Sequence, residues 1–226
     1  MIGSSNDTEL DKKIENESKL NGDIVQESFL DTYLNLTLKT IQGIKWVSNY
    51  CSNAKYILKV DDDVFVNSFS LLNYLDNLKL ETNNNLLCES HVNAPVQREL
   101  NSKFYIPYNV INKKFYSQYC NGAAYVFQGN LAPSLYEASL HIKYFKFEDI
   151  YFGLLATNLN LNFIDLNARY RFDYSSFQIN QLFESNTINE NFFMFPFYPE
   201  ILRNTWSKLT FANFSIELQR FHSSQI

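Results

Sequence analysis

The sequence predicts an α/β fold, in which helices flank a largely buried sheet. Short apolar runs rich in β-branched and aromatic residues, at 56–60 and 123–127, are typical of buried strands. Between such runs lie segments such as 35–51, where apolar residues recur every three or four positions, as in helices packed on a sheet. The 226 residues, 46% of them hydrophobic, suffice for one domain with a sizeable core, so we expect a single domain over 1–226.

Each element can be justified in chain order from periodicity, caps and turn residues. We expect strands at 24–25, 56–60, 86–92, 123–127 and 161–166. We expect helices at 35–51, from an N-cap at Ser68 through Leu78, from Asn130 and Pro133 to His141, from Phe147 through Leu159, and a short one from Pro199 to Trp206. Residues 1–21 are polar with few apolar anchors, 93–118 are irregular, Asn121-Gly122 is a turn, and an aromatic coil precedes Pro199.

Composition excludes some classes of function. The net charge of -5 argues against general binding to nucleic acid or to anionic membranes, which requires a basic face. Aromatic residues make up 16% of the chain, a surplus that suits a cleft in which sugar rings or a nucleobase stack. No apolar run approaches the roughly 20 residues of a membrane span, and no signal peptide is visible.

The stretch from Lys59 to Asn67 carries three consecutive carboxylates, Asp61, Asp62 and Asp63, between two apolar runs. Burying unpaired carboxylates is costly, so they mark the end of a strand, where open α/β sheets bind ligands. Their hard oxygen atoms suit Mg²⁺ or Mn²⁺ holding a diphosphate. The simple alternative is an acidic turn in water. An EF-hand is disfavoured, because its Gly and Glu positions fall on other residues whether counted from Asp61 or from Asp63.

Glu148 and Asp149 form a second acidic group at the expected start of a helix. Acids are common there because they complement the helix dipole, and that is the structural alternative for this pair. Sugar transfer from a nucleotide donor requires two tasks that two acidic groups can share. One group holds the cation that neutralises the diphosphate leaving group, and the other takes the proton of the acceptor hydroxyl. A single base acting opposite the leaving group inverts the anomeric centre.

Cysteines and sequons give weaker signals. The three cysteines, Cys51, Cys88 and Cys120, allow one disulfide and one free thiol, and their spacing fits no zinc site. Asn-x-Ser/Thr sequons occur at Asn6, Asn16, Asn35 and Asn213, which supports a secretory location only weakly in an Asn-rich chain.

The motifs in order resemble the β1,3-galactosyltransferase family, glycosyltransferase family thirty-one, over roughly residues 20 to 208. They are Asp23-Ile24-Val25-Gln26, Asn35-Leu36-Thr37-Leu38-Lys39-Thr40, Trp46 and Cys51, Lys59 to Asn67, Tyr119-Cys120-Asn121-Gly122, and Glu148 to Gly153. The resemblance implies a GT-A fold, a UDP-sugar donor, Mn²⁺, a glycan acceptor on glycoprotein or glycolipid, and a Golgi type II membrane enzyme with a lumenal catalytic domain and a signal anchor.

The resemblance also implies roles for individual residues. Asp63 with Asp61 would ligate the metal, and Asp61, Asp62 and Lys59 would bind the donor. Asp149, with Glu148 beside it, falls on the catalytic base of the family. Cys51 and Cys120 would form a disulfide that leaves Cys88 free, and Asn35 would carry an N-glycan.

Three departures from the family pattern stand out. A basic-x-Thr-Trp segment is absent and residues 1–3 resemble the second family strand, so we expect the chain to be truncated at its N-terminus. A family histidine near the metal is replaced by Phe195, which predicts weaker metal binding. Ala124 stands where the family tends to keep Gly, and Phe104 where Trp is usual, which leaves acceptor specificity open.

Two main hypotheses follow. The first is an inverting, metal-dependent β1,3-hexosyltransferase, with UDP-galactose as the donor and UDP-N-acetylglucosamine as the alternative. The second is a catalytically inactive, truncated member that acts as a binding domain. A secreted calcium-binding module is a third class that the loop spacing disfavours. The first hypothesis requires the acidic triplet and Asp149 to face one shared pocket.

Overall fold

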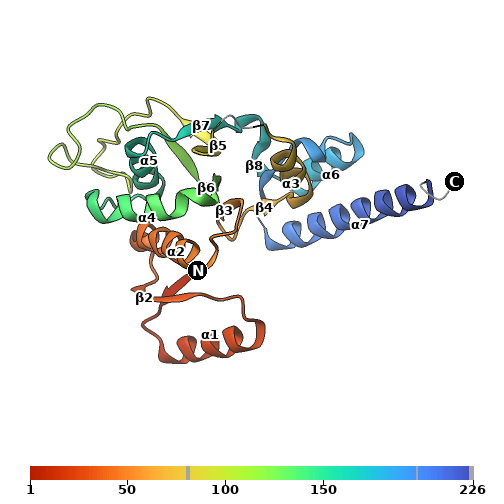
Figure 1. Cartoon of the computed structure of the whole chain (residues 1–226), viewed down its shortest axis with the longest axis horizontal. Helices are drawn as coiled ribbons and strands as arrows, with labels where there is room; N and C mark the ends of the chain where they lie inside the picture. The colour runs from red at the N-terminus through yellow and green to blue at the C-terminus, as the bar shows by residue number, and fades with distance from the viewer. Residues whose placement is uncertain (80–81, 197, 224–226) are drawn as a thin grey trace. The chain divides into compact units, whose positions relative to one another are not determined.

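A computed structural model of the chain describes residues 1–79, 82–196 and 198–223, of which 173, 174, 196 and 214–223 are described by their backbone alone. The chain divides into two compact units (Figure 1). Unit 1 comprises Met1–Lys59 and Thr82–Asp165, and unit 2 comprises Val60–Glu81 and Leu166–Ile226. Both mix strands with helices, which confirms the α/β class. The single domain expected over 1–226 stays a prediction.

Unit 1 holds a four-stranded sheet in the order β3-β6-β5-β7. β5 runs antiparallel to β6 and parallel to β7. Figure 1 shows α4 and α5 beside this sheet, and α2 packs on both helices. The elements of this unit are β1 (Ile2–Ser4), α1 (Thr8–Asn21), β2 (Gln26–Leu30), α2 (Leu36–Tyr50), β3 (Tyr56–Val60), β5 (Asn85–His91), β6 (Tyr119–Gln128), α4 (Ala132–His141), α5 (Glu148–Asn158) and β7 (Asn162–Asp165).

The core of unit 1 lies between β6 and the helix that carries the second acidic group. Tyr125 and Phe127 of β6 and Phe152 of α5 are almost fully buried, and the rings of Tyr125 and Phe152 lie 4.5 Å apart. Gly153 lets α5 approach the strand, because a Cβ atom there would lie 2.5 Å from the Cβ atom of Tyr119. This close packing holds α5 against the first residues of β6.

The strand β6 bulges over residues 121–124. Cys88 pairs with Tyr125, whereas Ser90 pairs with Cys120, so β6 uses more residues than β5 between these pairs. The side chain of Asn121 accepts a hydrogen bond from the Ala123 N–H at 3.0 Å, which stabilises the bulge. The predicted Asn121-Gly122 turn is thus wrong, because these residues lie within the strand.

The predicted disulfide between Cys51 and Cys120 is also wrong. Cys88 of β5 is bonded to Cys120 of β6, with their Cα atoms 5.6 Å apart, and Cys51 at the end of α2 is a free thiol. The cause is the sheet register, which makes β5 and β6 neighbours and brings these two buried cysteines within bonding distance.

The N-terminal residues form more structure than the sequence predicts. β1 pairs in parallel with β2, and β2 starts two residues after the strand expected at 24–25. α1 begins at an N-cap, where the Asp7 carboxylate accepts the N–H groups of Glu9 and Leu10, and it ends at Gly22 in the left-handed region. The helix buries no residue, so it leaves no apolar periodicity in the sequence.

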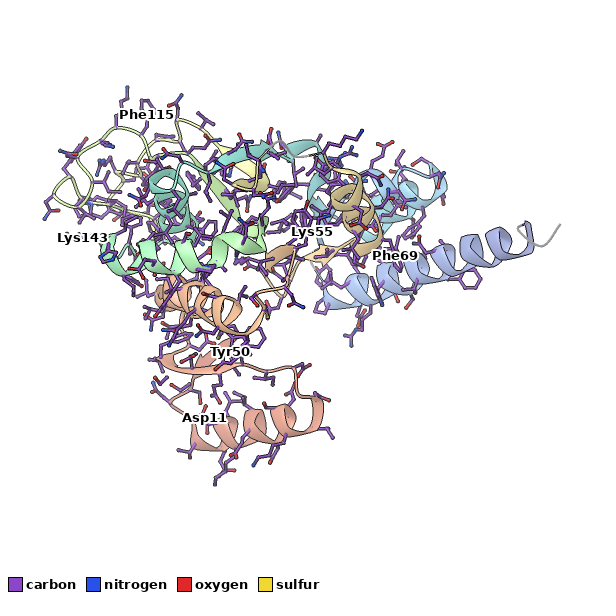
Figure 2. The ribbon with its side chains drawn as sticks, viewed as in Figure 1. Asp11, Tyr50, Lys55, Phe69, Phe115 and Lys143 are labelled. Atoms are coloured by element: carbon purple, nitrogen blue, oxygen red, sulfur yellow. A yellow bond between two sulfur atoms is a disulfide. The ribbon has the colours of Figure 1, made fainter. Side chains whose placement is uncertain are left out.

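Residues 93–118 connect β5 to β6 without a regular strand or helix, as predicted. An isolated bridge joins Pro95 to Phe115, which Figure 2 labels within this loop. The Arg98 guanidinium donates to the carbonyl oxygens of Ile106, Ile111 and Lys113. One side chain therefore holds three separate points of the loop backbone together.

Unit 2 contains a three-stranded sheet in the order β4-β9-β8. Phe65, Ile188, Met194 and Leu209 form its buried core. The expected aromatic coil is wrong, because it contains β8, α6 and β9, and the last helix is longer than predicted. The elements are β4 (Phe65–Val66), α3 (Ser68–Asn77), β8 (Tyr170–Tyr174), α6 (Ser176–Glu184), β9 (Phe193–Pro196) and α7 (Pro199–Ser223).

The helix α3 is capped by Asn67 rather than by Ser68. The Asn67 side chain accepts a hydrogen bond from the Ser70 N–H at 3.2 Å and donates to the Ile188 carbonyl oxygen at 3.1 Å. Since Asn67 is fully buried, this cap anchors the segment that follows the acidic triplet.

Candidate active site

Glu148 and Asp149 occupy the first turn of α5, after an N-cap at Phe147. The Ile150 N–H donates to Asp149 Oδ1 at 2.8 Å. The positive end of the helix dipole and unpaired N–H groups favour anionic side chains in this position. The prediction that both acids begin a helix is confirmed.

Glu148 is buried and connects three elements. Its Oε1 accepts hydrogen bonds from the Tyr125 hydroxyl of β6 at 2.6 Å and from the Thr40 hydroxyl of α2 at 2.9 Å. Its Oε2 lies 3.9 Å from Lys59 Nζ of β3. Burial raises the pKa of Glu148, although the Lys59 charge and the two hydroxyl groups oppose that shift. Both oxygens thus face protein groups, which suits a positioning role.

Lys59 of β3 contacts both the bulge of β6 and Glu148. Its ammonium donates to the Gly122 carbonyl oxygen in the bulge of β6 and lies 5.8 Å from the centre of the Tyr125 ring. It therefore fixes the bulge and Glu148 relative to β3. Its predicted part in donor binding stays a prediction.

Asp149 is half-buried, unlike its neighbour. Burial raises its pKa, and the opposing influences are the Ile150 N–H, its own N–H, and the charges of His91 and Lys59. Gly122 leaves room for this carboxylate, since a Cβ atom at Gly122 would lie 3.2 Å from the Asp149 Cβ atom. A half-exposed carboxylate with a raised pKa is suited to accept a proton near neutral pH.

The acidic triplet follows β3 in a tight turn, in which the Val64 N–H donates to the Asp61 carbonyl oxygen at 3.3 Å. Asp61, Asp62 and Asp63 are exposed, while Val64 and Phe65 anchor the turn in a buried environment. The predicted strand end is thus confirmed.

The donor chemistry of this turn fits a hard divalent cation, because carboxylate oxygens are its preferred ligands. Within residues 1–79, 82–196 and 198–223, no group of three or more His, Cys, Asp or Glu side chains converges to hold a metal ion. The two predicted ligands, Asp61 and Asp63, would need oxygens from the diphosphate and from water to complete a coordination shell.

The structure places the predicted site residues in two groups. Lys59, Glu148 and Asp149 lie together in unit 1, whereas the triplet belongs to unit 2. The shared pocket that the sequence predicts for them stays a prediction. Phe195, in place of the family histidine, stacks on Phe172 with ring centres 4.5 Å apart and offers no metal ligand.

The predicted glycosylation site at Asn35 precedes α2. Its amide donates to the Leu30 carbonyl oxygen at 2.8 Å. The sequon hydroxyl, on Thr37, is buried and donates to the Phe145 carbonyl oxygen at 2.9 Å. Glycosylation at Asn35 stays a prediction, and it would have to precede folding of this segment.

The sequence analysis assigned no individual role to Thr40, Tyr119, Tyr125 or His91, although Thr40 and Tyr119 lie within its motifs. A usable signal existed for Tyr125, since its hydroxyl within an apolar strand must find a buried partner. No comparable signal existed for Thr40, because its contact with Glu148 joins residues 108 positions apart.

An aspartate turn after a strand and a pair of acids at a helix start are the two features from which the sequence predicts sugar transfer, and the structure contains both. The chain belongs to the galactosyltransferase family, since the family model described as Galactosyltransferase matches residues 1–167. This confirms the resemblance that the motifs indicated. The match includes both acidic groups and ends before β8.

Two kinds of curated relative are similar to this chain. Beta-1,3-galactosyltransferase 1 of Mus musculus and that of Homo sapiens are each 35% identical over 162 residues, covering 72% of this chain and 50% of their own. UDP-GalNAc:beta-1,3-N-acetylgalactosaminyltransferase 1 of Mus musculus is 41% identical over 165 residues, covering 71% of this chain and 47% of its own. The chain thus spans about half the length of these relatives. Among the described residues, no helix has the length and apolarity to cross a bilayer.

Proposed function

We propose that the protein is an inverting hexosyltransferase that moves a sugar from a UDP donor to the 3-hydroxyl of an acceptor glycan, forming a β1,3 linkage. Galactose is the first choice of sugar. N-acetylgalactosamine is a second choice, because one relative carries that donor in its name, and N-acetylglucosamine is a third. The observation that carries the proposal is the half-buried Asp149 carboxylate at the start of α5, in a chain of the galactosyltransferase family.

In this mechanism Asp149 takes the proton of the acceptor 3-hydroxyl. The acceptor oxygen then bonds to the anomeric carbon of the donor as the bond to the UDP oxygen breaks, and the anomeric configuration inverts. Glu148, held by Tyr125 and Thr40, and paired with Lys59, fixes the turn of α5 on which Asp149 lies.

Asp61 and Asp63 would hold Mn²⁺, with Asp62 and Lys59 contributing to donor binding. When bound, such a cation stabilises the negative charge that develops on the diphosphate leaving group. The GT-A arrangement implied by the family would support this division of tasks between the two acidic groups. We also assign the reaction to the Golgi lumen, with a membrane anchor, as the family resemblance implies. The Cys88–Cys120 disulfide fits an oxidising compartment of this kind.

The test compares Asp149→Asn with Asp76→Asn, which makes the same chemical change on the exposed face of α3. Each protein is incubated with Mn²⁺ and UDP-galactose, UDP-N-acetylgalactosamine or UDP-N-acetylglucosamine, and with β-galactoside and β-N-acetylglucosaminide acceptors. The product linkage is determined by mass spectrometry and NMR. We expect Asp149→Asn to lower transfer by about 10²- to 10⁴-fold while donor binding persists, because general base catalysis contributes that much. Substantial transfer by Asp149→Asn would contradict the assignment.

A second candidate function is a non-catalytic domain that binds nucleotide weakly. Phe195 favours this reading, because an aromatic stack occupies the position where the family resemblance places a metal-proximal histidine. Stabilisation of the fold by UDP together with Mn²⁺ separates the two candidates.

A further inference from the structure

Three aromatic rings, those of His91, Tyr116 and Tyr119, lie together where β5 ends and β6 begins in unit 1. His91, the last residue of β5, pairs directly with Tyr119, the first residue of β6. Side chains of directly opposed residues lie on the same face of an antiparallel pair. Accordingly, the His91 and Tyr119 rings lie 5.1 Å apart, and the Tyr116 ring meets Tyr119 edge-on at 6.0 Å.

Packing of α5 on β6 brings Asp149 towards these rings. A Cβ atom at Gly153 would lie 2.5 Å from the Tyr119 Cβ atom, and Asp149, four residues before Gly153, lies on the same face of α5. Burial raises the pKa of Tyr119 to about 12, and the Asp149 charge adds to that shift. The Asp149 charge also adds to the burial that raises the pKa of Tyr116. The His91 charge in turn lowers the pKa of Asp149, so all three rings are within electrostatic reach of this carboxylate.

Within the part of the chain that the structure describes, the fold leaves the hydrogen-bonding capacity of the Tyr119 hydroxyl unfilled. Its side chain is half-buried, and among the described residues its hydroxyl makes no hydrogen bond. A partly exposed hydroxyl bonds to water in the free protein and can exchange that water for a polar group of a ligand. With a pKa of about 12 the phenol stays protonated near neutral pH, so it can both donate and accept a hydrogen bond.

We propose that Tyr119, Tyr116 and His91 form the platform that binds the terminal pyranose of the acceptor, with the Tyr119 hydroxyl bonding a sugar hydroxyl next to the one that Asp149 deprotonates. A pyranose has an apolar C–H face that packs on aromatic rings and a rim of hydroxyl groups that needs polar partners. Tyr119 offers both kinds of partner next to the helix that carries Asp149, since α5 packs directly on Tyr119 through Gly153 and on Gly122 through Asp149. This inference rests on the proposed function, since it assumes that Asp149 is the base.

The test uses methyl β-glycosides of galactose, N-acetylglucosamine and N-acetylgalactosamine as probes, because they carry no second ring. Their binding is measured by saturation-transfer NMR, without donor, so that the readout is independent of catalysis. The variants are Tyr119→Leu, which removes the ring, Tyr119→Phe, which removes only the hydroxyl, and His91→Ala. Tyr50→Leu is the control, because Tyr50 is 71% exposed at the end of α2 (Figure 2).

We expect at least one glycoside to bind, and Tyr119→Leu to weaken its binding about tenfold, since a stacked ring contributes on the order of 1.4 kcal/mol. Tyr119→Phe and His91→Ala should weaken it less, and Tyr50→Leu should not. In transfer assays the same changes should raise the acceptor KM and leave the donor KM unchanged. Circular dichroism and the melting temperature verify that each variant is folded, and Tyr119→Phe, which keeps the ring, remains informative if Tyr119→Leu does not fold.

The inference is overturned if no glycoside binds, or if Tyr119→Phe and every folded ring-removing variant bind the glycoside as tightly as the unmodified protein. Failure of the proposed function gives a different result. In that case a glycoside binds in a Tyr119-dependent manner, but no sugar is transferred from any of the three donors.

Discussion

Gly122 lies directly against Asp149, because a Cβ atom at position 122 would be 3.2 Å from the Asp149 Cβ atom and 3.4 Å from Glu148 Oε2. The β6 bulge and the start of α5 therefore meet at a position where any side chain would displace an acid. The contact links a local irregularity in a strand to the placement of the proposed base.

Gly122→Ala should reduce transfer about tenfold to a hundredfold, because small displacements of catalytic groups have effects of this size. Stability should change little, since the contact can relax by a few tenths of an ångström. Gly43→Ala is the matched control, because a Cβ atom at Gly43 in α2 meets nothing within 4 Å. Steady-state kinetics measure the transfer rate, and melting temperatures measure the stability. An unchanged transfer rate in Gly122→Ala would show that the position of Asp149 does not limit the reaction.

Glu148→Gln should change the pH dependence of stability. Burial raises the pKa of Glu148, so the folded protein holds this proton more readily than the unfolded chain. Its contribution is therefore greatest below the ordinary Glu pKa and is lost as the pH rises. The free energy of unfolding of Glu148→Gln, relative to the unmodified protein, should rise with pH above about 4.3. Urea unfolding from pH 4.5 to 8 measures this difference, and a constant difference would contradict it.

Tyr125→Phe should destabilise unit 1. Of the two hydroxyl hydrogen bonds to Glu148 Oε1, the one from Tyr125 is the shorter, and the Tyr125 side chain is fully buried. Loss of such a bond to a buried carboxyl costs about 1–3 kcal/mol. Urea unfolding measures the loss, with Tyr50→Phe as the exposed control. Equal stability of the two variants would mean that the Tyr125 bond contributes nothing net.

Peptide mapping under non-reducing conditions should find Cys88 linked to Cys120 and Cys51 as a thiol. Replacing both Cys88 and Cys120 by Ser should lower the free energy of unfolding by about 2–4 kcal/mol, as expected for a native disulfide. Cys51→Ser should be close to neutral. A peptide linking Cys51 to Cys120 would refute the pairing.

UDP and Mn²⁺ together should raise the melting temperature more than either alone, because a ligand that binds only the folded state stabilises it by mass action. Asp63→Asn should remove this shift, and Asp76→Asn on α3 should keep it. Differential scanning fluorimetry measures both. The absence of any shift in the unmodified protein would favour the non-catalytic alternative.

Local pattern was sufficient to predict the elements that carry the site. α2, β3 and α5 follow apolar periodicity, and the structure places each within a residue or two of its predicted bounds. In contrast, α1 was missed because it buries no residue. β8 and α6 were missed although they carried signals, namely the alternation of aromatic and charged residues in β8 and the Ser175–Gln178 capping box of α6.

The sequence alone did not predict which side chains contact one another. The Cys88–Cys120 bond depends on the register of β5 and β6, and the Thr40–Glu148 bond joins two helices that sequence reasoning does not place together. The pair Glu148-Asp149 could be found, but the different burial of the two acids depends on packing against β6. Tertiary contacts, rather than motif spacing, therefore separate the positioning acid from the proposed base.

The guanidinium of Arg98, which spans three carbonyl oxygens of the 93–118 loop, gives that segment an internal scaffold independent of any sheet ladder. Exposed residues such as Leu100 and Val110 can then vary in size or polarity while the anchoring geometry persists. The surface residues of this loop can therefore change while its backbone conformation is kept, because the hydrogen bonds of one guanidinium replace several backbone hydrogen bonds.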